Sequence, residues 1–506
     1  MIENLRISFG DTRAVDDLSF ALPPGGSVGI VGESGSGKSA TALALLGLHR
    51  TATVSGQIRF GDIDLTTLRS ERDWRRIRGA RIAMVFQEPL TALSPFHRIG
   101  DQIAEVYRLH TGATRRAARH RAVEVLKQVH IADAERRAES YPHQFSGGMR
   151  QRALIAMALA CRPEVIVADE PTTALDVTVQ AQILDLLDEV RTTTGTGLLL
   201  ISHDLGVVAG STDTVVVMRN GRAVEQGATG SVLVTPREAY TRELIEAAPH
   251  PNPPRTVPDD PILRVSGVRK HFKLPKRGLI RAVDGITLDV RRGETMGIVG
   301  ESGTGKTTLA RMMVGLVEPS EGTITLDGVD IARRRGRSVQ MVFQDPLSSL
   351  NPRRTVGESI ADPLRLQGVR DPRARVSELL ERVGLAAKEY DRYPHQLSGG
   401  MRQRVGIARA LAPQPKLIVC DEPVSSLDVT TQAQILALLE DLRESLDLTL
   451  VVVSHDLAVL RQIADRVAVL SGGSVVELGD TAEVYERPVH RYTKELIAAV
   501  RRSHII

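Results

Sequence analysis

Cysteine and aromatic residues are scarce in this sequence. Two of its 506 residues are cysteine, Cys161 and Cys420, and aromatic residues make up 3%. Two cysteines are too few for a metal cluster. Each belongs to or follows an apolar run, so we expect small buried side chains in a reducing compartment, with a disulfide between them as the less favoured alternative. No basic tract carries interleaved aromatic residues, so the sequence predicts no nucleic-acid interface of that kind.

Long apolar runs are missing as well. The longest, at residues 198–201 and 448–453, have the length of strands and are much shorter than a bilayer span. The N-terminal residues lack the charged and apolar segments of a signal peptide. We therefore expect a cytoplasmic protein, soluble or peripheral. The net charge of +4 is better explained by a solvated basic surface than by a lipid or nucleic-acid partner.

The sequence is instead rich in repeated motifs. Its length predicts two to four compact units. Ser-Gly-Gly-Met-Arg-Gln-Arg begins at Ser146 and again at Ser398, 252 residues later, and Asp-Glu-Pro begins at Asp169 and at Asp421 with the same offset. The first copy is longer, chiefly through an Arg-rich stretch at residues 68–78 that we interpret as a surface insertion. A Pro-rich linker, 249–261, separates copy one (1–248) from copy two (262–506).

Each copy contains a glycine-rich loop of the form Gly, any four residues, Gly-Lys-Ser/Thr. An apolar run precedes each loop and helix-forming residues follow it, as a phosphate-binding loop requires. Glycines permit a turn whose backbone N–H groups face phosphate oxygens, and the Lys reaches the β- and γ-phosphates. The residues predicted to bind nucleotide phosphates are Gly32, Ser34, Gly35, Gly37, Lys38, Ser39 and Ala40 in the first copy, and Gly300, Ser302, Gly303, Gly305, Lys306, Thr307 and Thr308 in the second.

Alternating strand-like and helix-like runs predict an α/β core in each copy. Short apolar runs at 165–168, 198–201 and 214–218 are typical of buried parallel strands. The pattern of residues 115–130 is typical of an amphipathic helix. Asp169 and Asp421 follow such runs, so their carboxylates are expected at strand ends, where they can hold Mg²⁺ through its water shell. The adjacent Glu170 and Glu422 are candidates to polarise an attacking water.

The repeated Ser-Gly-Gly motif predicts a second anion site. Ser146 and Ser398 are good N-caps for helices that continue to Ala160 and Ala412. The glycines leave backbone N–H groups accessible, and the helix dipole favours a phosphate. The predicted residues of these sites are Ser146, Gly147, Gly148, Ser398, Gly399 and Gly400.

Taken in order, these motifs resemble the nucleotide-binding domain of ABC transporters, twice over and across nearly the whole chain. The motifs Phe86-Gln87-Glu88-Pro89, Phe343-Gln344-Asp345-Pro346, Tyr141-Pro142-His143-Gln144 and Tyr393-Pro394-His395-Gln396 are similar to those of the ATPase pair of the peptide/nickel (dipeptide and oligopeptide) importer family. The resemblance implies two tandem P-loop NTPase domains, each with a RecA-like core, an antiparallel β subdomain and a helical subdomain.

The resemblance also implies roles for further residues. Ser39, Gln87 and Asp169 in one copy, and Thr307, Gln344 and Asp421 in the other, would hold Mg²⁺. His203 and His455 would contact the γ-phosphate, although pattern alone equally allows a structural histidine at a strand end. Asp176 and Asp428 would lie at the seam between the copies. The two copies would close head to tail, so that each Ser-Gly-Gly motif covers the ATP held by the other copy's loop.

Two aromatic residues and the absence of a cysteine-rich element bear on which cofactors the protein binds. Phe9 and Phe272 stand ahead of the loops, where they could stack on adenine or be core residues. Several family members carry a cysteine-rich C-terminal element that holds an iron–sulfur cluster. The residues starting at Tyr240 and Tyr492 match the helix before that element, but no cysteines follow. We therefore predict ATP and Mg²⁺ as cofactors and no cluster.

The predicted function is that of an ATPase subunit driving solute import, peripheral on the cytoplasmic side of the membrane. Two transmembrane permease subunits and an extracytoplasmic substrate-binding protein are implied as partners, and no nucleic acid. Tandem ABC ATPases that act on ribosomes or DNA are alternatives, but they usually carry long charged linkers, zinc-binding cysteines or coiled coils. An exporter ATPase is a further alternative. The sequence leaves peptides, nickel chelates, glutathione and other small solutes open as substrates.

Overall fold

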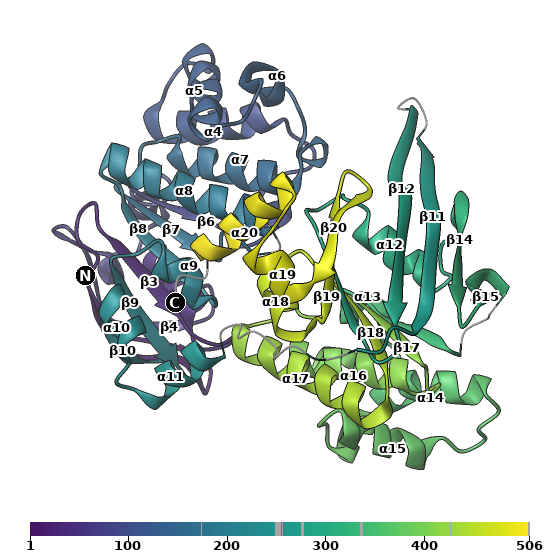
Figure 1. The fold of residues 1–506 in the computed structure, drawn as a ribbon. Coiled ribbons are helices and arrows are strands. Elements are labelled where there is room, and N and C mark those ends of the chain that lie inside the picture. Colours follow the sequence, from purple (N-terminus) through teal and green to yellow (C-terminus); the bar gives the residue numbers. More distant parts are fainter. Residues whose placement is uncertain are drawn as a thin grey trace. The chain divides into compact units, whose positions relative to one another are not determined.

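The computed structural model describes residues 1–173, 175–247, 255, 257–274, 278–333, 337–425 and 427–503. The chain divides into two compact units: unit 1 comprises Met1–Ala247 and the C-terminal residues from Arg501, and unit 2 comprises residues 248–500 (Figure 1). Among the described residues each unit contains a four-stranded and a six-stranded sheet, and corresponding strands follow the same order in both units. The fold is therefore the predicted duplication of one α/β domain.

The elements of unit 1 fall into strands and helices. Its strands are β1 (Ile2–Phe9), β2 (Thr12–Phe20), β3 (Ser27–Val31), β4 (Thr53–Phe60), β5 (Ile63–Asp64), β6 (Ile82–Val85), β7 (Val165–Asp169), β8 (Gly197–Ser202), β9 (Thr214–Arg219) and β10 (Arg222–Ala228). Its helices are α1 (Lys38–Leu45), α2 (Glu71–Arg75), α3 (Pro89–Ala92), α4 (Ile99–Thr111), α5 (Arg115–Gln128), α6 (Ala134–Ala138), α7 (Gly147–Leu159), α8 (Val177–Thr194), α9 (Leu205–Ala209), α10 (Thr229–Val234) and α11 (Ala239–Glu246), with 3-10 turns η1 (Leu65–Thr67) and η2 (Pro142–Gln144).

The elements of unit 2 repeat this series. Its strands are β11 (Pro261–Leu274), β12 (Gly278–Arg291), β13 (Thr295–Val299), β14 (Glu321–Leu326), β15 (Val329–Asp330), β16 (Val339–Val342), β17 (Leu417–Asp421), β18 (Thr449–Ser454), β19 (Arg466–Ser471) and β20 (Ser474–Asp480). Its helices are α12 (Lys306–Met313), α13 (Pro346–Ser349), α14 (Val356–Leu366), α15 (Arg373–Arg382), α16 (Gly399–Leu411), α17 (Val429–Leu446), α18 (Leu457–Ile463), α19 (Thr481–Glu486) and α20 (Arg491–Ser503), with 3-10 turns η3 (Ile331–Arg333), η4 (Ala387–Asp391) and η5 (Pro394–Gln396).

The six-stranded sheet of unit 1 is the core predicted from the short apolar runs. Its order is β10-β9-β3-β8-β7-β6, and all strands but β10 run parallel. Both faces are covered. Along β8, Leu198 and Leu200 pack against helices, whereas Leu199 and Ile201 pack toward the antiparallel sheet. Because all parallel strands end at one edge, the segments that follow β3, β7 and β8 meet there.

The remaining parts of unit 1 flank this sheet. The antiparallel sheet β2-β1-β4-β5 and helix α1 enclose one apolar cluster with the core strands. On the other face α4, α5 and α7 share a second cluster with α8 and the sheet (Figure 1). The predicted helical subdomain, including the amphipathic helix now seen as α5, is thus confirmed, and so are the RecA-like core and the antiparallel subdomain.

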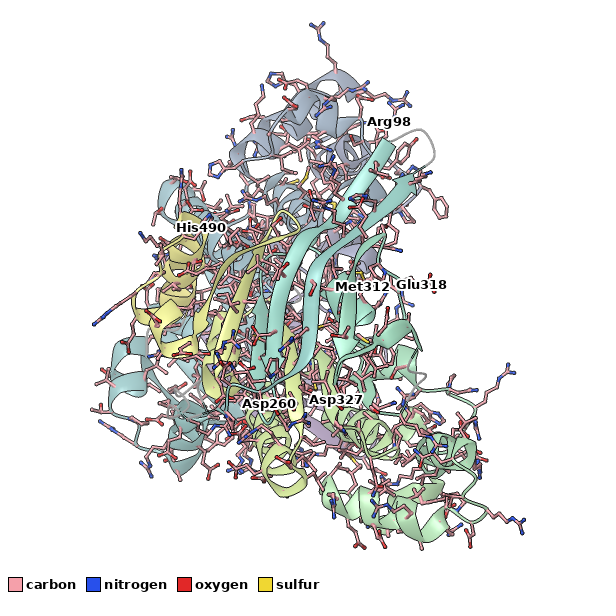
Figure 2. All side chains as sticks on the ribbon, turned by 45° about the vertical axis from the view of Figure 1, so that its right-hand side comes forward. Arg98, Asp260, Met312, Glu318, Asp327 and His490 are labelled. Atoms are coloured by element: carbon pink, nitrogen blue, oxygen red, sulfur yellow. The ribbon has the colours of Figure 1, made fainter. Side chains whose placement is uncertain are left out.

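Unit 2 has the same layers with its own sets of buried contacts. Met312 of α12 is fully buried beneath the strands (Figure 2). Asp260 and Asp327 lie at one end of the antiparallel sheet (Figure 2), where Arg292 donates hydrogen bonds to both. Hydrogen bonds from Lys416 and Arg292 outweigh the effect of partial burial and lower the pKa of Asp327 to about 2.

Three predictions outside the sites have different outcomes. The insertion at 68–78 is largely at the surface, but Ile77 is buried and Arg78 donates hydrogen bonds to the carbonyl oxygens of Leu46 and Gly47, so it is anchored in the core. Most of the linker lies outside the described residues. Both cysteines are free thiols; Cys420 is buried, which raises its thiol pKa to about 12, and Cys161 is only partly buried, contrary to expectation.

Candidate active sites

The loop after β3 folds around the amino group of Lys38. This group donates hydrogen bonds to the carbonyl oxygens of Gly32 (2.7 Å) and Glu33 (2.9 Å). Gly37 lies just before α1 with φ of 98°, and a Cβ there would be 2.4 Å from the carbonyl oxygen of Ala14, so only glycine fits. A Cβ at Gly35, by contrast, would meet no described atom within 4 Å. The loop therefore leaves an open concave face at the N-terminus of α1.

The second loop repeats this geometry. The amino group of Lys306 donates to the carbonyl oxygens of Gly300 (2.6 Å) and Glu301 (2.8 Å). Gly305 has φ of 95°, and a Cβ there would be 2.1 Å from the carbonyl oxygen of Ala282. Ser34 and Ser302 are exposed in their respective loops. Each predicted loop thus presents backbone donors, a helix N-terminus and a lysine, which suit the phosphates of ATP.

A hydroxyl–carboxylate pair adjoins each loop. Ser39 Oγ donates to Asp169 Oδ1 and Thr307 Oγ1 donates to Asp421 Oδ1, both at 3.1 Å. Burial raises the pKa of Asp169 to about 6, an effect that the nearby charge of Glu170 adds to, and burial likewise raises the pKa of Asp421. Two hard oxygen donors side by side, one of them a buried carboxylate, fit a Mg²⁺ ion.

The carboxylate of Glu170 is surrounded by hydrogen-bond donors. Its Oε2 atom accepts from Gln87 Nε2 (2.8 Å) and Thr173 Oγ1 (2.9 Å), and lies 3.2 Å from His203 Nδ1. Glu170 also has φ of 47°, a strained value for a non-glycine residue, and its backbone N–H donates to the carbonyl oxygen of Ile201. The structure therefore brings together the Gln, Glu and His that the sequence placed in three separate motifs.

Unit 2 contains the same Glu–Gln–His cluster, with a different hydroxyl residue beside the glutamate. Glu422 Oε2 accepts from Gln344 Nε2 at 2.7 Å and lies 3.4 Å from His455 Nδ1, and the φ of Glu422 is again 47°. Thr173 is replaced by Ser425, whose hydroxyl donates to the carbonyl oxygen of Glu422 at 3.3 Å. The two clusters agree in their three central groups.

Each histidine forms an ion pair with its glutamate. Burial by itself would lower the pKa of His203, but the hydrogen bond and charge of Glu170 outweigh burial and raise it. Conversely, burial would raise the pKa of Glu170, but the hydrogen bond and charge of His203 lower it. The same opposing effects act on His455 and Glu422. Oxygen Oε2 of Glu170 is thus ionised and saturated by donors, which makes it a weak base in this arrangement.

The Ser-Gly-Gly motifs begin helices, and their two glycines differ. Ser146 Oγ accepts from the backbone N–H of Met149 at the start of α7, and Ser398 caps α16 in the same way. A Cβ at Gly148 would be 2.5 Å from a methyl carbon of Val179, so this glycine permits close packing of α7 on α8. A Cβ at Gly147 would meet only Leu175, at 3.5 Å. The equivalent contacts for Gly400 and Gly399 are with Thr431 and Leu427.

Other predicted residues are placed as follows. Phe9 and Phe272 are 40% and 41% exposed, which excludes the alternative that they are core residues. The ring of Phe9 has an edge contact with His49, and Lys270 lies over the ring of Phe272. Asp176 and Asp428 cap α8 and α17 by accepting backbone hydrogen bonds, so each has a structural role within its own unit.

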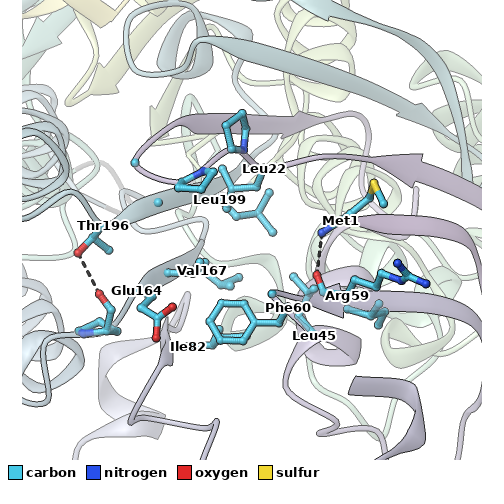
Figure 3. A pocket seen from close by; sticks show the side chains of 18 of the residues that line it. Met1, Leu22, Leu45, Arg59, Phe60, Ile82, Glu164, Val167, Thr196 and Leu199 are labelled. Atoms are coloured by element: carbon cyan, nitrogen blue, oxygen red, sulfur yellow. Dashed lines mark hydrogen bonds between the residues drawn. The ribbon is translucent and has the colours of Figure 1, made fainter. Parts of the chain in front are cut away.

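A cavity of about 430 Å³ in unit 1 is unrelated to these residues (Figure 3). It lies between the two sheets, and its lining includes Phe20, Leu22 and Phe60 but none of the predicted site residues. In unit 2 the strand register places Leu263 of β11 opposite Val290 and Leu326, the counterparts of Leu22 and Phe60. The cavity therefore lies apart from the nucleotide site.

Sequence reasoning missed three contacts at the sites. Thr173 donates to the catalytic candidate Glu170, and nothing in the motif pattern marked it. Tyr240 and Tyr492 accept hydrogen bonds from the two glycine-rich loops. The signal that could have found the tyrosines is the offset of 252 residues, which they share with the Ser-Gly-Gly and Asp-Glu-Pro motifs.

Comparisons with known proteins assign the chain to a family. The family model "ABC transporter" matches residues 15–173 and 283–425. The model "Oligopeptide/dipeptide transporter, C-terminal region" matches residues 224–266 and 476–504. These two pairs of matches follow the duplication, with the C-terminal region after each ATPase core.

Among related proteins, "Glutathione import ATP-binding protein GsiA" from Shigella sonnei and from Escherichia coli K12 are each 44% identical over 99% of this chain and 89% of their own. Among solved structures, the archaeal ribosome recycling factor aABCE1 in complex with ribosomal stalk protein aP1 aligns with a TM-score of 0.63 over 92% of this chain and 88% of that chain, at 22% identity, which concerns the fold alone. The chain belongs to the ABC transporter family, as an ATPase with two fused nucleotide-binding domains of the oligopeptide/dipeptide transporter type.

Proposed function

We propose that this protein is the ATP-hydrolysing subunit of an importer for glutathione, short peptides or related small solutes. The observation that carries the proposal is the duplicated cluster of phosphate-binding lysine, hydroxyl–carboxylate pair and Glu–Gln–His group at the end of each central sheet. Proteins called glutathione import ATP-binding proteins share 44% of its residues across nearly the whole chain. Both copies keep these groups, so we propose two competent sites.

The chain's own groups suit phosphate-bond hydrolysis. Loop N–H groups and Lys38 would bind the phosphates, while Ser39, Asp169 and Gln87 would hold Mg²⁺. A bound Mg²⁺ neutralises charge on the phosphates. Glu170 would polarise the attacking water, and its basicity would rise if Oε2, which Gln87, Thr173 and His203 all contact, lost one of these donors. Movement of Gln87 would therefore convert a weak base into an effective one.

Closure of the two units is the proposed cause of that movement. Ser146 to Gly148 would cover ATP held by Lys306, and Ser398 to Gly400 would cover ATP held by Lys38. Gly147 and Gly399 have little beside them, so a phosphate can approach the helix N-termini of α7 and α16 there. Phe9 and Phe272 keep enough exposed ring area to stack on adenine. Hydrolysis would then reopen the pair.

Two transmembrane permease subunits are the proposed partners that use this motion. In the described part of the chain, no helix combines the length and apolarity needed to cross a bilayer. In unit 2 a cleft of about 620 Å³ lies beside α13, α14 and α16 and is lined by Ser349, Arg354, Asp362 and Arg409 among others. Gln344 lies two residues before the start of α13, so a permease segment seated in this cleft would sense the state of Glu422.

The remaining parts of the proposal concern location and substrate. The protein would bind the cytoplasmic face of the membrane through the permeases, and an extracytoplasmic binding protein would deliver the solute. The substrate would be recognised by these partners, and glutathione is the first candidate because the relatives named above import it.

Reconstitution tests the proposal. The chain is co-expressed with two candidate permease subunits, purified from membranes and placed in vesicles with a candidate binding protein. We expect ATP hydrolysis that rises several-fold with binding protein and glutathione, and uptake that a Glu170→Gln, Glu422→Gln double variant abolishes. Recovery of the protein with ribosomes and without permeases would contradict the transport proposal. If dipeptides stimulate hydrolysis and glutathione does not, only the proposed substrate would be wrong.

A further inference from the structure

A tyrosine from the C-terminal region of each unit contacts the glycine-rich loop. In unit 1 the backbone N–H of Glu33 donates to the hydroxyl oxygen of Tyr240 at 3.2 Å. In unit 2 the N–H of Glu301 donates to the hydroxyl oxygen of Tyr492 at 2.9 Å. These tyrosines are separated in sequence from the loops by 207 and 191 residues. The same long-range contact is thus made twice, once in each unit.

The tyrosine contacts the same loop residue whose carbonyl oxygen accepts a hydrogen bond from the phosphate-binding lysine. Glu33 gives its N–H to Tyr240 and its carbonyl oxygen accepts from Lys38 Nζ at 2.9 Å. Glu301 is held between Tyr492 and Lys306 in the same way. Binding of ATP phosphates would draw the lysine away from these carbonyl oxygens. The tyrosine hydroxyl would then be the fixed point that holds this bend of the loop.

The tyrosine helices are themselves fixed by carboxylates of the same C-terminal region. Glu225 of β10 accepts from the backbone N–H groups of Arg237 and Glu238, just before α11. In unit 2, Glu477 of β20 accepts from those of Val489 and His490, and His490 precedes α20 (Figure 2). Each carboxylate closes the turn that leads into a helix, so the position of the tyrosine is set from outside the nucleotide site.

We infer that Tyr240 and Tyr492 are positioning residues for the glycine-rich loops, through which the oligopeptide-type C-terminal region sets the affinity of each site for nucleotide. The region matched by that family model, 224–266 and 476–504, contains both tyrosines and both carboxylates. The ring of Tyr240 is buried and lies beneath the guanidinium of Arg219, 4.4 Å from its centroid, which restrains it further. A partner that shifts α11 or α20 would therefore alter ATP binding without touching ATP.

Loss of the hydroxyl alone is the direct test. In Tyr240→Phe, Tyr492→Phe the rings remain but the N–H groups of Glu33 and Glu301 lose their acceptor. A hydrogen bond of this kind corresponds to about two- to tenfold in an equilibrium constant, so we expect the KM for ATP to rise by that factor with kcat within about twofold. The matched control is Tyr485→Phe, which removes a phenolic hydroxyl from α19 in the same region. We expect it to leave both constants unchanged.

The inference rests on the ATPase activity and not on the proposed substrate. Equal KM values for the double variant and the control, or a fall in kcat with KM unchanged, would overturn it. Thermal unfolding of the variants without nucleotide separates loop positioning from general loss of folding. Loop positioning predicts a raised KM for ATP in a variant whose melting temperature equals that of the wild type. Failure of the wild-type protein to hydrolyse ATP would instead contradict the ATPase assignment.

Discussion

Asp169 should destabilise the nucleotide-free protein at neutral pH, and Asp169→Asn should stabilise it. Burial raises the pKa of this carboxyl from 3.8 to about 6, so folding favours the protonated form. The stabilising effect of that proton is complete below pH 3.8 and is lost as the pH rises through about 6. At pH 7 the ionised carboxylate is therefore buried at a cost.

The cost follows from the size of the pKa shift. A rise from 3.8 to about 6 corresponds to about 3 kcal/mol at pH 7, and asparagine, which does not ionise, avoids it. Asparagine can also still accept the hydrogen bond from Ser39. We therefore expect a gain of up to about 3 kcal/mol in the free energy of unfolding at pH 7 and no gain below about pH 4. The same change should abolish ATP turnover at this site because it weakens Mg²⁺ binding.

Tryptophan fluorescence during urea unfolding can measure this in one unit. Trp74 is the sole tryptophan of the chain, and it packs with its α2 segment against the core of unit 1. Asp421→Asn is the matched control, since it makes the same change in unit 2 and should leave the Trp74 transition in place. If Asp169→Asn lowers the midpoint at pH 7, or if its gain persists at pH 4, burial of an ionised carboxylate is not the cause.

Three further outcomes follow from the sites. Glu170→Gln and Glu422→Gln, made singly, should each reduce ATP turnover; loss of all activity with one and none with the other would show that the sites are not equivalent. Gly37→Ala should lower the urea midpoint of the Trp74 transition more than Gly35→Ala, because both glycines have positive φ but only the first would place a Cβ against a carbonyl oxygen; equal losses would contradict this packing argument. Folding raises the pKa of His203 above 6.5, so its ion pair with Glu170 stabilises the protein fully below pH 6.5 and less as the pH rises through the raised pKa. His203→Gln should therefore remove this decline of the urea midpoint at higher pH. An unchanged dependence of the midpoint on pH would exclude the ion pair as the source of the decline.

The sequence predicted the parts of the fold that depend on local pattern. Strands β3, β7, β8 and β9 were visible because two-sided burial in a parallel sheet makes their runs continuously apolar. Helices α7 and α16 were visible from their Ser caps. The lysines and hydroxyls of the sites could be named from the glycine-rich motif and the carboxylates from their strand ends, whereas Gln87 and His203 were implied by the family resemblance.

Contacts that depend on tertiary packing could not be predicted. Gly148 carries no local sign that Val179 lies 2.5 Å from its missing Cβ, and Asp176 reads equally well as a seam residue and as a helix cap. The saturation of Glu170 by three donors follows only from the placement of separate segments in space. Likewise, the link from Tyr240 to the loop joins residues at opposite ends of the unit.

Comparison of the two copies shows which distances at the candidate sites stay constant and which neighbouring residues differ. Ser39 is exchanged for Thr307, and Thr173 for Ser425, yet the hydroxyl-to-carboxylate distance stays at 3.1 Å and the Gln-to-Glu distance differs by only 0.1 Å, at 2.8 and 2.7 Å. By contrast, Arg409 in the unit 2 cleft corresponds to Met157 in α7, and Asp362 to Glu105 in α4. The geometry of the two candidate sites is thus constant, whereas Arg409 in the cleft has an uncharged counterpart in unit 1. The two units would thus present different side chains to the proposed permease partners.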